Sequence, residues 1–188
     1  MRLILIGILV LASSFSIHAK DLMRIEISGQ IEGIVDIELL SNLAPNHVKQ
    51  IKTLVIEKKY DGVAFHRVIE GFMAQSGDVE YGIINEYSAT MVGKGGSHLK
   101  DLKAEFSNQP FNRGIVGMAR AQDPNSANSQ FFIMLEDGHF LNGNYTVFGK
   151  VSSGMEIVDR IKRGEKSDNG MISSEPDYMS RVTIITKD

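Results

Sequence analysis

The sequence predicts a single domain of mostly antiparallel β structure with two short helices. Short stretches that alternate apolar and polar residues predict strands, and glycine-containing turns separate most of them. Only two segments place apolar residues at helical spacing. The length of 188 residues suits one domain with a sizeable core, and a hydrophobic content of 43% is ordinary for a globular protein. Composition alone does not distinguish a barrel from a sandwich.

The first 19 residues differ from the rest and predict a secretory signal peptide. Arg2 provides a positive start, residues 3–11 form an almost unbroken apolar run, and Ala19 is a small residue at a plausible cleavage point. The run is shorter than the ~20 apolar residues that a membrane span needs, so we expect cleavage and no stable membrane insertion afterwards. An uncleaved anchor is the alternative. The mature chain, residues 20–188, is expected in the periplasm, and secretion from another kind of cell would fit the same leader.

After the leader, the chain begins with a hairpin and a helix. Residues 23–27 and 34–39 each alternate apolar and polar positions, and glycines between them mark a turn. Pro45 suits the first turn of a helix, where its missing N–H is not needed. The helix that follows would bury the apolar residues that recur at helical spacing, which are Val48, Ile51, Leu54 and Val55.

Six further strands are predicted, at residues 63–69, 71–75, 114–119, 130–135, 145–151 and 181–185. Gly71 is expected to form a bend or bulge. Residues 76–112 lose the regular pattern and predict long surface loops, which often carry function. The segment Ser153–Glu156 has the spacing of a capping box and predicts a second helix. Its inward-facing residues would be Ile157, Val158 and Ile161.

Charge, cysteine and histidine content narrow the possible functions. The formal net charge is −3, and it becomes −4 after the leader because the leader carries one arginine and no acid. Without a basic tail, nucleic acid is not an expected partner. The absence of cysteine excludes disulfides and thiolate nucleophiles and is compatible with export. His47, His98 and His139 lack the spacing of zinc ligands, so no metal is expected. No long heptad pattern or apolar stripe is present, and we expect a monomer.

Two segments carry the strongest functional signal, Phe65–Arg67 with the nearby Gly71–Asp78, and Ser129–Ile133. Each places polar side chains among aromatic and thioether ones. This mixture suits a site that holds an apolar ring and hydrogen-bonds an amide beside it, as a proline and its preceding peptide bond would require.

Together with Gly114–Arg120 and Thr146–Val151, these segments resemble the cyclophilin family of peptidyl-prolyl isomerases, from about Met23 to the C-terminus. The resemblance implies a closed eight-stranded β-barrel capped by two helices, and the two predicted helices agree with it. It also implies an isomerase of X-Pro bonds that acts on proline-containing polypeptides without a cofactor. The leader indicates that its substrates would be exported proteins that are folding.

Arg67 is the expected catalytic residue. Amide resonance gives the peptide bond a rotation barrier of ~18–20 kcal/mol, so X-Pro isomers interconvert slowly. A catalyst must hold the ring, exclude water and favour the twisted amide over both planar forms. A cationic donor beside the amide can do so electrostatically. Arg67 matches the central arginine of cyclophilins, and its guanidinium stays charged and offers donors in a fixed plane.

The resemblance also assigns the residues that would bind substrate. Phe132 and Phe65 are expected to pack in the core, because neighbours on a strand face opposite sides. Ordinary core packing is the alternative for the other apolar residues as well. Because isomerisation moves no proton, His66 is assigned to binding or orientation. The expected pocket consists of Phe72, Met73, Phe131, Phe140 and Leu141, while His66, Gln75, Gln130 and Tyr145 would orient the peptide or Arg67, and the backbone of Ala119 and Arg120 would pair with it.

Three positions depart from the common eukaryotic pattern. Phe140 stands where many members carry Trp, Tyr145 where many carry His, and Arg120 where many carry Asn. Loss of the indole N–H donor at position 140 predicts weak binding of cyclosporin. The stretch from Gly82 to Lys103 also departs from the family pattern, so its binding residues stay unassigned.

Two other functions remain possible from the sequence. A catalytically idle cyclophilin fold could hold peptides or act as a chaperone, and isomerase activity of the wild-type protein distinguishes it from the enzyme. A hydrolase could use Ser76, His66 and Asp78, although Ser76 lies in no nucleophile-elbow context.

Overall fold

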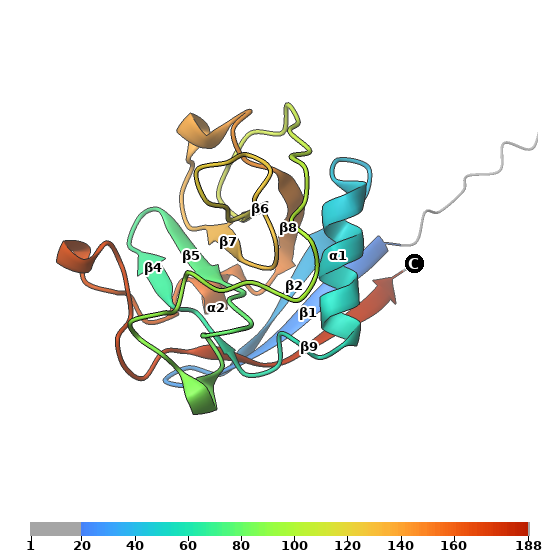
Figure 1. The fold of residues 1–188 in the computed structure, drawn as a ribbon. Coiled ribbons are helices and arrows are strands. Elements are labelled where there is room, and N and C mark those ends of the chain that lie inside the picture. The colour runs from blue at the N-terminus through green and yellow to red at the C-terminus, as the bar shows by residue number, and fades with distance from the viewer. Residues whose placement is uncertain (1–19, 188) are drawn as a thin grey trace, which may run out of the picture.

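A computed structural model describes residues 20–187 as one curled antiparallel sheet with two α-helices (Figure 1). The predicted signal peptide, residues 1–19, lies outside the described residues. Within residues 20–187, no helix has the length and apolar character that crossing a membrane requires. The strands are β1 Lys20–Ser28, β2 Gly33–Leu39, β3 Val63–Ala64, β4 Arg67–Ile69, β5 Met73–Ser76, β6 Ile115–Met118, β7 Phe131–Met134, β8 Val147–Ser153 and β9 Tyr178–Lys187. The α-helices are α1 Pro45–Ile56 and α2 Met155–Val158, and 3-10 turns span Ile84–Glu86, His139–Leu141 and Lys166–Asp168.

The sheet curls so that its two end strands follow each other in the chain. The strand order is β3-β9-β1-β2-β8-β6-β7-β5-β4, with every neighbouring pair antiparallel. The predicted strand 63–69 is split into β3, which pairs with β9, and β4, which pairs with β5. The split occurs at Phe65 and His66, whose backbone groups bond instead to Asp177 and Ile172. The mostly β class with two helices is confirmed, and nine strands replace the expected eight because of this split. The expected closed barrel is a curled sheet instead, whose end strands β3 and β4 are not paired with each other.

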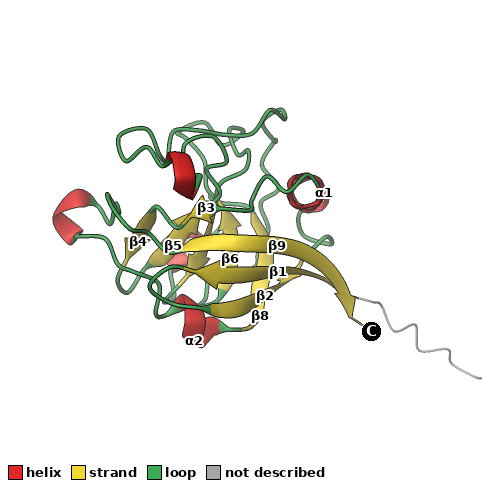
Figure 2. Ribbon diagram, turned by 90° about the horizontal axis from the view of Figure 1, so that it is seen from below, coloured by secondary structure: helices red, strands yellow, loops and turns green. Residues whose placement is uncertain are grey.

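The two helices lie on opposite sides of the curled sheet (Figure 2). Helix α1 begins at Pro45 and buries the apolar face expected from its periodicity. Helix α2 is a single turn, and its predicted capping box is wrong. Gly154, not Ser153, is the N-cap residue, with a φ of +90° and no side-chain cap. A Cβ there would lie 2.2 Å from the carbonyl oxygen of Ile34, so both the backbone conformation and the space require glycine.

Strand residues alternate between two apolar clusters. The larger cluster fills the interior and includes Ala74, Phe131 and Ile133. The smaller one lies on the other face of β5, β6 and β7 and includes Met73 and Phe132. Because alternate residues of a strand face opposite sides, the same short strands build both clusters. The smaller cluster is the floor of the groove described below.

Helix α1 receives its N-terminal cap from a distant loop. Its N-cap residue, Ala44, has no side-chain oxygen to offer. The carboxylate of Glu105 instead accepts the backbone N–H of Asn46 at 3.2 Å and that of His47 at 3.1 Å, and lies 2.6 Å from Nδ1 of His47. Burial acts to raise the pKa of Glu105, but hydrogen bonds from His47 and Asn46 outweigh it and hold the pKa below its ordinary value.

We expect Glu105→Gln to lower the free energy of unfolding by about 1–2 kcal/mol at pH 7, because a charged helix cap is lost. A carboxyl with a depressed pKa stabilises the fold above its unfolded pKa and loses this effect as pH falls through the folded pKa. Urea unfolding should therefore show that the difference in free energy of unfolding between Glu105→Gln and wild type becomes smaller towards pH 4. Glu32→Gln, at an exposed position, is the control. A difference in free energy of unfolding that is equal at pH 4 and pH 7 would contradict the assignment of Glu105 as a charged cap of α1.

Candidate active site

A groove of about 280 Å³ opens on the smaller apolar cluster. Strands β4, β5 and β7 supply its floor and one wall, and the turn His139–Leu141 supplies part of the rim. The structure brings together most of the residues predicted to bind substrate. The lining residues are Arg67, Phe72, Met73, Gln75, Ala119, Arg120, Phe132, Phe140, Leu141 and Tyr145.

The floor of the groove is apolar and rigidly packed. Met73, Phe132 and Leu141 are buried. The ring of Phe132 stacks on that of Phe111 at 5.7 Å and meets the edge of Tyr145 at 5.8 Å. Aromatic rings at these distances and angles stabilise one another by more than the burial of their apolar surface alone provides, so they keep the floor of the groove in a fixed shape.

The rim of the groove is open to solvent, whereas the strand behind its floor is tightly packed. Phe140 is 71% exposed and its ring lies 5.5 Å from that of Phe72, which leaves an apolar wall open to an incoming ring. Behind the floor, Gly117 leaves room for the stacked rings, since a Cβ there would lie 2.6 Å from Phe111 and 2.7 Å from Phe132. The groove is therefore open above and tightly filled below.

The predicted orientations of Phe131 and Phe132 are wrong. Phe131 is fully buried in the interior cluster, where its ring lies 5.8 Å from Tyr60 and 6.1 Å from Phe148. Phe132 lines the groove instead. The strand register explains why Phe132 and not Phe131 faces the groove, because Gln75 on β5 is the direct partner of Phe132 on β7. Directly opposed residues of an antiparallel pair share one face.

Three hydrogen bonds hold the guanidinium of Arg67 at the groove wall. Its Nη1 donates to Oε1 of Gln75 at 3.2 Å. Its Nε donates to the backbone carbonyl of Asn169 at 2.9 Å, and its Nη2 donates to Oδ1 of the same residue at 3.0 Å. Burial lowers the pKa of Arg67 from its ordinary value, but that value is so high that the side chain stays charged at neutral pH.

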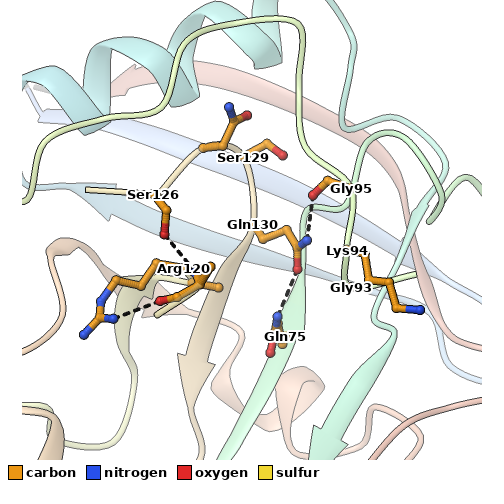
Figure 3. Close-up of a pocket in the computed structure, with 11 residues that line it drawn as sticks. Gln75, Gly93, Lys94, Gly95, Arg120, Ser126, Ser129 and Gln130 are labelled. Atoms are coloured by element: carbon orange, nitrogen blue, oxygen red, sulfur yellow. Dashed lines mark hydrogen bonds between the residues drawn. The ribbon is translucent and has the colours of Figure 1, made fainter. Parts of the chain in front are cut away.

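Gln75, Gln130 and Gly95 form a hydrogen-bonded relay (Figure 3), and its other end bonds to Arg67. Nε2 of Gln130 donates to the carbonyl oxygen of Gly95 at 2.8 Å, and Nε2 of Gln75 donates to Oε1 of Gln130 at 3.0 Å. A backbone carbonyl can only accept, so Gly95 fixes the direction of both amides. The oxygen of Gln75 consequently faces Arg67.

A second cavity, of about 350 Å³, adjoins the groove. It shares Gln75, Ala119 and Arg120 with the groove, and Gly93, Lys94 and Gly95 form another part of its wall (Figure 3). The last three belong to the stretch 82–103, which sequence reasoning left unassigned. The fold therefore brings part of this unusual loop directly to the site.

Arg120 and Tyr145 form one unit between the two cavities. The Arg120 guanidinium lies 4.4 Å from the centre of the Tyr145 ring, and its Nη2 donates to the carbonyl of Asn144 at 2.9 Å. The backbone N–H of Ala119 donates to the carbonyl of Gln130 at 2.9 Å. This N–H therefore already has an acceptor, and the predicted pairing of the Ala119 and Arg120 backbone with substrate would have to use other backbone groups.

The predicted role of His66 in binding peptide is wrong. Its side chain is fully buried and does not line the groove. Arg67 on β4 lines the groove, whereas His66 lies in the break between β3 and β4 with its ring inside the protein. Burial lowers the pKa of His66 to about 4, which keeps the ring neutral at physiological pH.

Ser76, His66 and Asp78 do not form a hydrolytic triad. All three are buried. The hydroxyl of Ser76 donates to the carbonyl of Ala64 at 2.9 Å, and the ring nitrogens of His66 have no hydrogen-bond partner. The carboxylate of Asp78 accepts backbone N–H groups, among them those of Gly93 at 2.7 Å and Gly95 at 3.0 Å. A nucleophile paired with a base is therefore absent from this set.

Comparisons with known proteins identify the family of this chain. The sequence model of the family described as cyclophilin type peptidyl-prolyl cis-trans isomerase/CLD matches residues 22–185. A probable peptidyl-prolyl cis-trans isomerase of Brucella suis is 60% identical over 154 residues, which cover 81% of this chain and 78% of that protein. A peptidyl-prolyl cis-trans isomerase of Acinetobacter baylyi is 38% identical over 167 residues, covering 86% and 83%.

A solved structure extends the agreement to the fold. The cyclophilin type peptidyl-prolyl cis-trans isomerase of Cryptosporidium parvum, crystallised in the presence of the dipeptide Ala-Pro, superposes with a TM-score of 0.72 at 28% identity, covering 88% of this chain and 99% of that one. The match over 22–185, the close relatives and this fold lead to one conclusion. The chain belongs to the cyclophilin-type peptidyl-prolyl cis-trans isomerases.

Proposed function

We propose that this isomerase accelerates X-Pro isomerisation in exported proteins as they fold, with Arg67 as its catalytic residue. The observation that carries the proposal is the position of a charged, three-point-bonded guanidinium at the wall of an apolar groove. The groove offers burial to a proline ring, and the guanidinium offers donors to the amide beside it. The other charged side chain of the groove lining, Arg120, is bonded instead to the carbonyl of Asn144 and lies over the ring of Tyr145.

The chemistry follows from amide resonance. Twisting the X-Pro bond breaks the resonance and returns a lone pair to the proline nitrogen. A fixed cationic donor stabilises this charge distribution more than that of the planar amide, so it lowers the barrier in both directions. Met73, Phe132 and Leu141 hold the ring and keep water away. The Ala-Pro dipeptide used with the Cryptosporidium relative supports proline-containing peptides as the substrate class.

The test of the activity is the cis-to-trans rate of a short Ala-Pro peptide with residues 20–188. A catalysed rate supports the isomerase over a fold that only binds peptide. An uncatalysed rate, with peptide binding retained, would favour the binding module instead.

Export is supported by the leader-like residues 1–19 and by the absence of cysteine. The test is to express the full chain in a Gram-negative host, fractionate the cells and determine the N-terminus of the recovered protein. We expect periplasmic protein that begins at Lys20. Protein retained in the cytoplasm with residues 1–19 intact would contradict export, and membrane-bound protein of full length would favour an anchor.

Cyclosporin is expected to inhibit weakly, because Phe140 has no indole N–H to donate. Phe140 lies exposed at the rim of the groove, so a larger ring can be accommodated there. We expect Phe140→Trp to tighten cyclosporin binding about tenfold, the value of one well-placed hydrogen bond. Isothermal titration calorimetry of both proteins measures the difference, because the wild-type chain has no tryptophan whose fluorescence could be compared. Nanomolar inhibition of the wild-type protein would refute the prediction.

A further inference from the structure

Sequence reasoning did not select Asn169, yet it makes more hydrogen bonds to Arg67 than any other residue in the described chain. Its backbone carbonyl accepts from Nε and its side-chain Oδ1 accepts from Nη2, so one residue contacts two nitrogens of the guanidinium. Gln75 holds the third nitrogen, Nη1. We propose that Asn169 is a positioning residue, which fixes the plane of the Arg67 guanidinium for catalysis.

These hydrogen bonds determine which N–H groups of the Arg67 guanidinium remain available to a substrate. A guanidinium has five N–H groups, and three of those of Arg67 are bonded to Asn169 and Gln75. One N–H on each terminal nitrogen remains for a substrate amide. Without the bond to Asn169, the Nη2 group and the side chain behind it would have more freedom of rotation. The donors would then spend less time in the orientation that stabilises the twisted amide.

The backbone conformation at this position explains how one residue reaches two nitrogens. Asn169 has φ +54° and ψ 33°, the left-handed region that asparagine tolerates better than most residues. Gly170 follows with φ +77°, and a Cβ there would lie 2.4 Å from the Ile69 side chain. The loop is thus packed closely against β4, beside which it lies in Figure 1.

The loop does not depend on the Asn169 side chain for its position. Val68 N–H donates to Gly170 at 2.8 Å, Gly164 N–H donates to Val68 at 3.0 Å, and Gly170 N–H donates to Glu165 at 2.9 Å. These backbone bonds remain when only the side chain of residue 169 is removed. A variant can therefore delete the Oδ1 contact and leave the loop in place.

Asn169→Gly is this variant, because glycine accepts the left-handed conformation and keeps the carbonyl that bonds to Nε. The matched control is Lys58→Gly, which removes the side chain from another left-handed residue, φ +57°, at an exposed site outside both cavities. Both substitutions are expected to leave the melting temperature unchanged or slightly raised.

The inference rests on the proposed catalytic function of Arg67, so Arg67→Ala is measured beside it. For an Ala-Pro peptide, we expect Asn169→Gly to lower kcat by roughly threefold to tenfold, with KM changed less than twofold. In ¹⁵N-arginine-labelled protein, the terminal nitrogens of Arg67 should rotate faster about their bonds to Cζ, while the Nε–H signal persists. Lys58→Gly should match wild type in both measurements.

The outcomes separate the two proposals. If Arg67→Ala is inactive while Asn169→Gly keeps full kcat, the positioning role is refuted and the catalytic role of Arg67 stands. If Arg67→Ala stays active, the catalytic role itself fails. A fall in kcat in Asn169→Gly without a change in the Arg67 signals would also overturn the inference, because the loss would then not pass through the guanidinium.

Discussion

Replacing Arg67 with alanine is expected to lower kcat/KM for an Ala-Pro peptide by about two to three orders of magnitude, the usual effect of removing one preorganised transition-state donor. The loss should fall mainly on kcat, because Met73, Phe132 and Leu141 still bind the ring. The fold should be unaffected, since the Arg67 side chain lies outside the interior cluster. Far-UV circular dichroism and the melting temperature check this condition.

Two further variants separate charge from geometry in this experiment. Arg67→Lys keeps the positive charge and loses the planar fork, so its activity should lie between those of wild type and Arg67→Ala. Arg181→Ala, at an exposed position on β9, removes an arginine remote from the groove lining and should retain full activity. If Arg67→Ala keeps more than about a third of the wild-type kcat/KM, electrostatic catalysis by this residue is excluded.

Features that depend on local sequence could be predicted from this chain. The apolar spacing of α1 and the proline at its start predicted both the helix and its buried face. The strands could be placed to within a few residues, because alternation is visible in a single stretch. The groove residues Arg67, Phe72, Met73 and Gln75 came from a motif in which they lie close together in the chain.

The errors concern the direction in which a side chain points. Gln130 and Phe132 are two residues apart and share a face, as the structure confirms. The prediction instead placed the neighbours Gln130 and Phe131 in one site, which the alternation of a strand does not allow. His66 was also misplaced, since it lies in the break between β3 and β4 and its ring is buried.

Long-range contacts outside the family motifs could not be predicted. Asn169 lies 102 residues from Arg67 in the chain, and its only local signal is an Asn-Gly pair typical of a turn. Glu105 lies 58 residues from His47, and an ordinary loop glutamate gives no sign that it caps a helix. The roles of Asn169 and Glu105 depend on how distant loops pack in the folded protein, which no single stretch of sequence shows.

Asp78 is the second residue for which a large effect is expected. Its carboxylate is fully buried and accepts four backbone N–H groups: Oδ1 accepts those of Glu80 at 3.1 Å and Tyr81 at 2.9 Å, and Oδ2 accepts those of Gly93 and Gly95. In Asp78→Asn, one oxygen becomes an NH₂ group that faces two backbone donors. Two hydrogen bonds of the buried side chain are lost and two partly buried N–H groups are left without acceptors, so we expect the free energy of unfolding to fall by about 2–4 kcal/mol.

This substitution should also lower activity in protein that is still folded. Gly95 accepts the hydrogen bond that orients Gln130, and through it Gln75 and Arg67. Fewer hydrogen bonds from residue 78 loosen the loop that carries Gly95, so the relay loses its fixed end, and kcat should fall about tenfold at temperatures well below the melting point. Amide hydrogen exchange should be faster at Gly93 and Gly95 in this variant. The control is Asp137→Asn, at an exposed carboxylate that accepts one backbone N–H, which should change neither kcat nor the exchange rates of Gly93 and Gly95. Full kcat in Asp78→Asn despite rapid exchange at Gly95 would mean that the loop stabilises the fold without orienting Arg67.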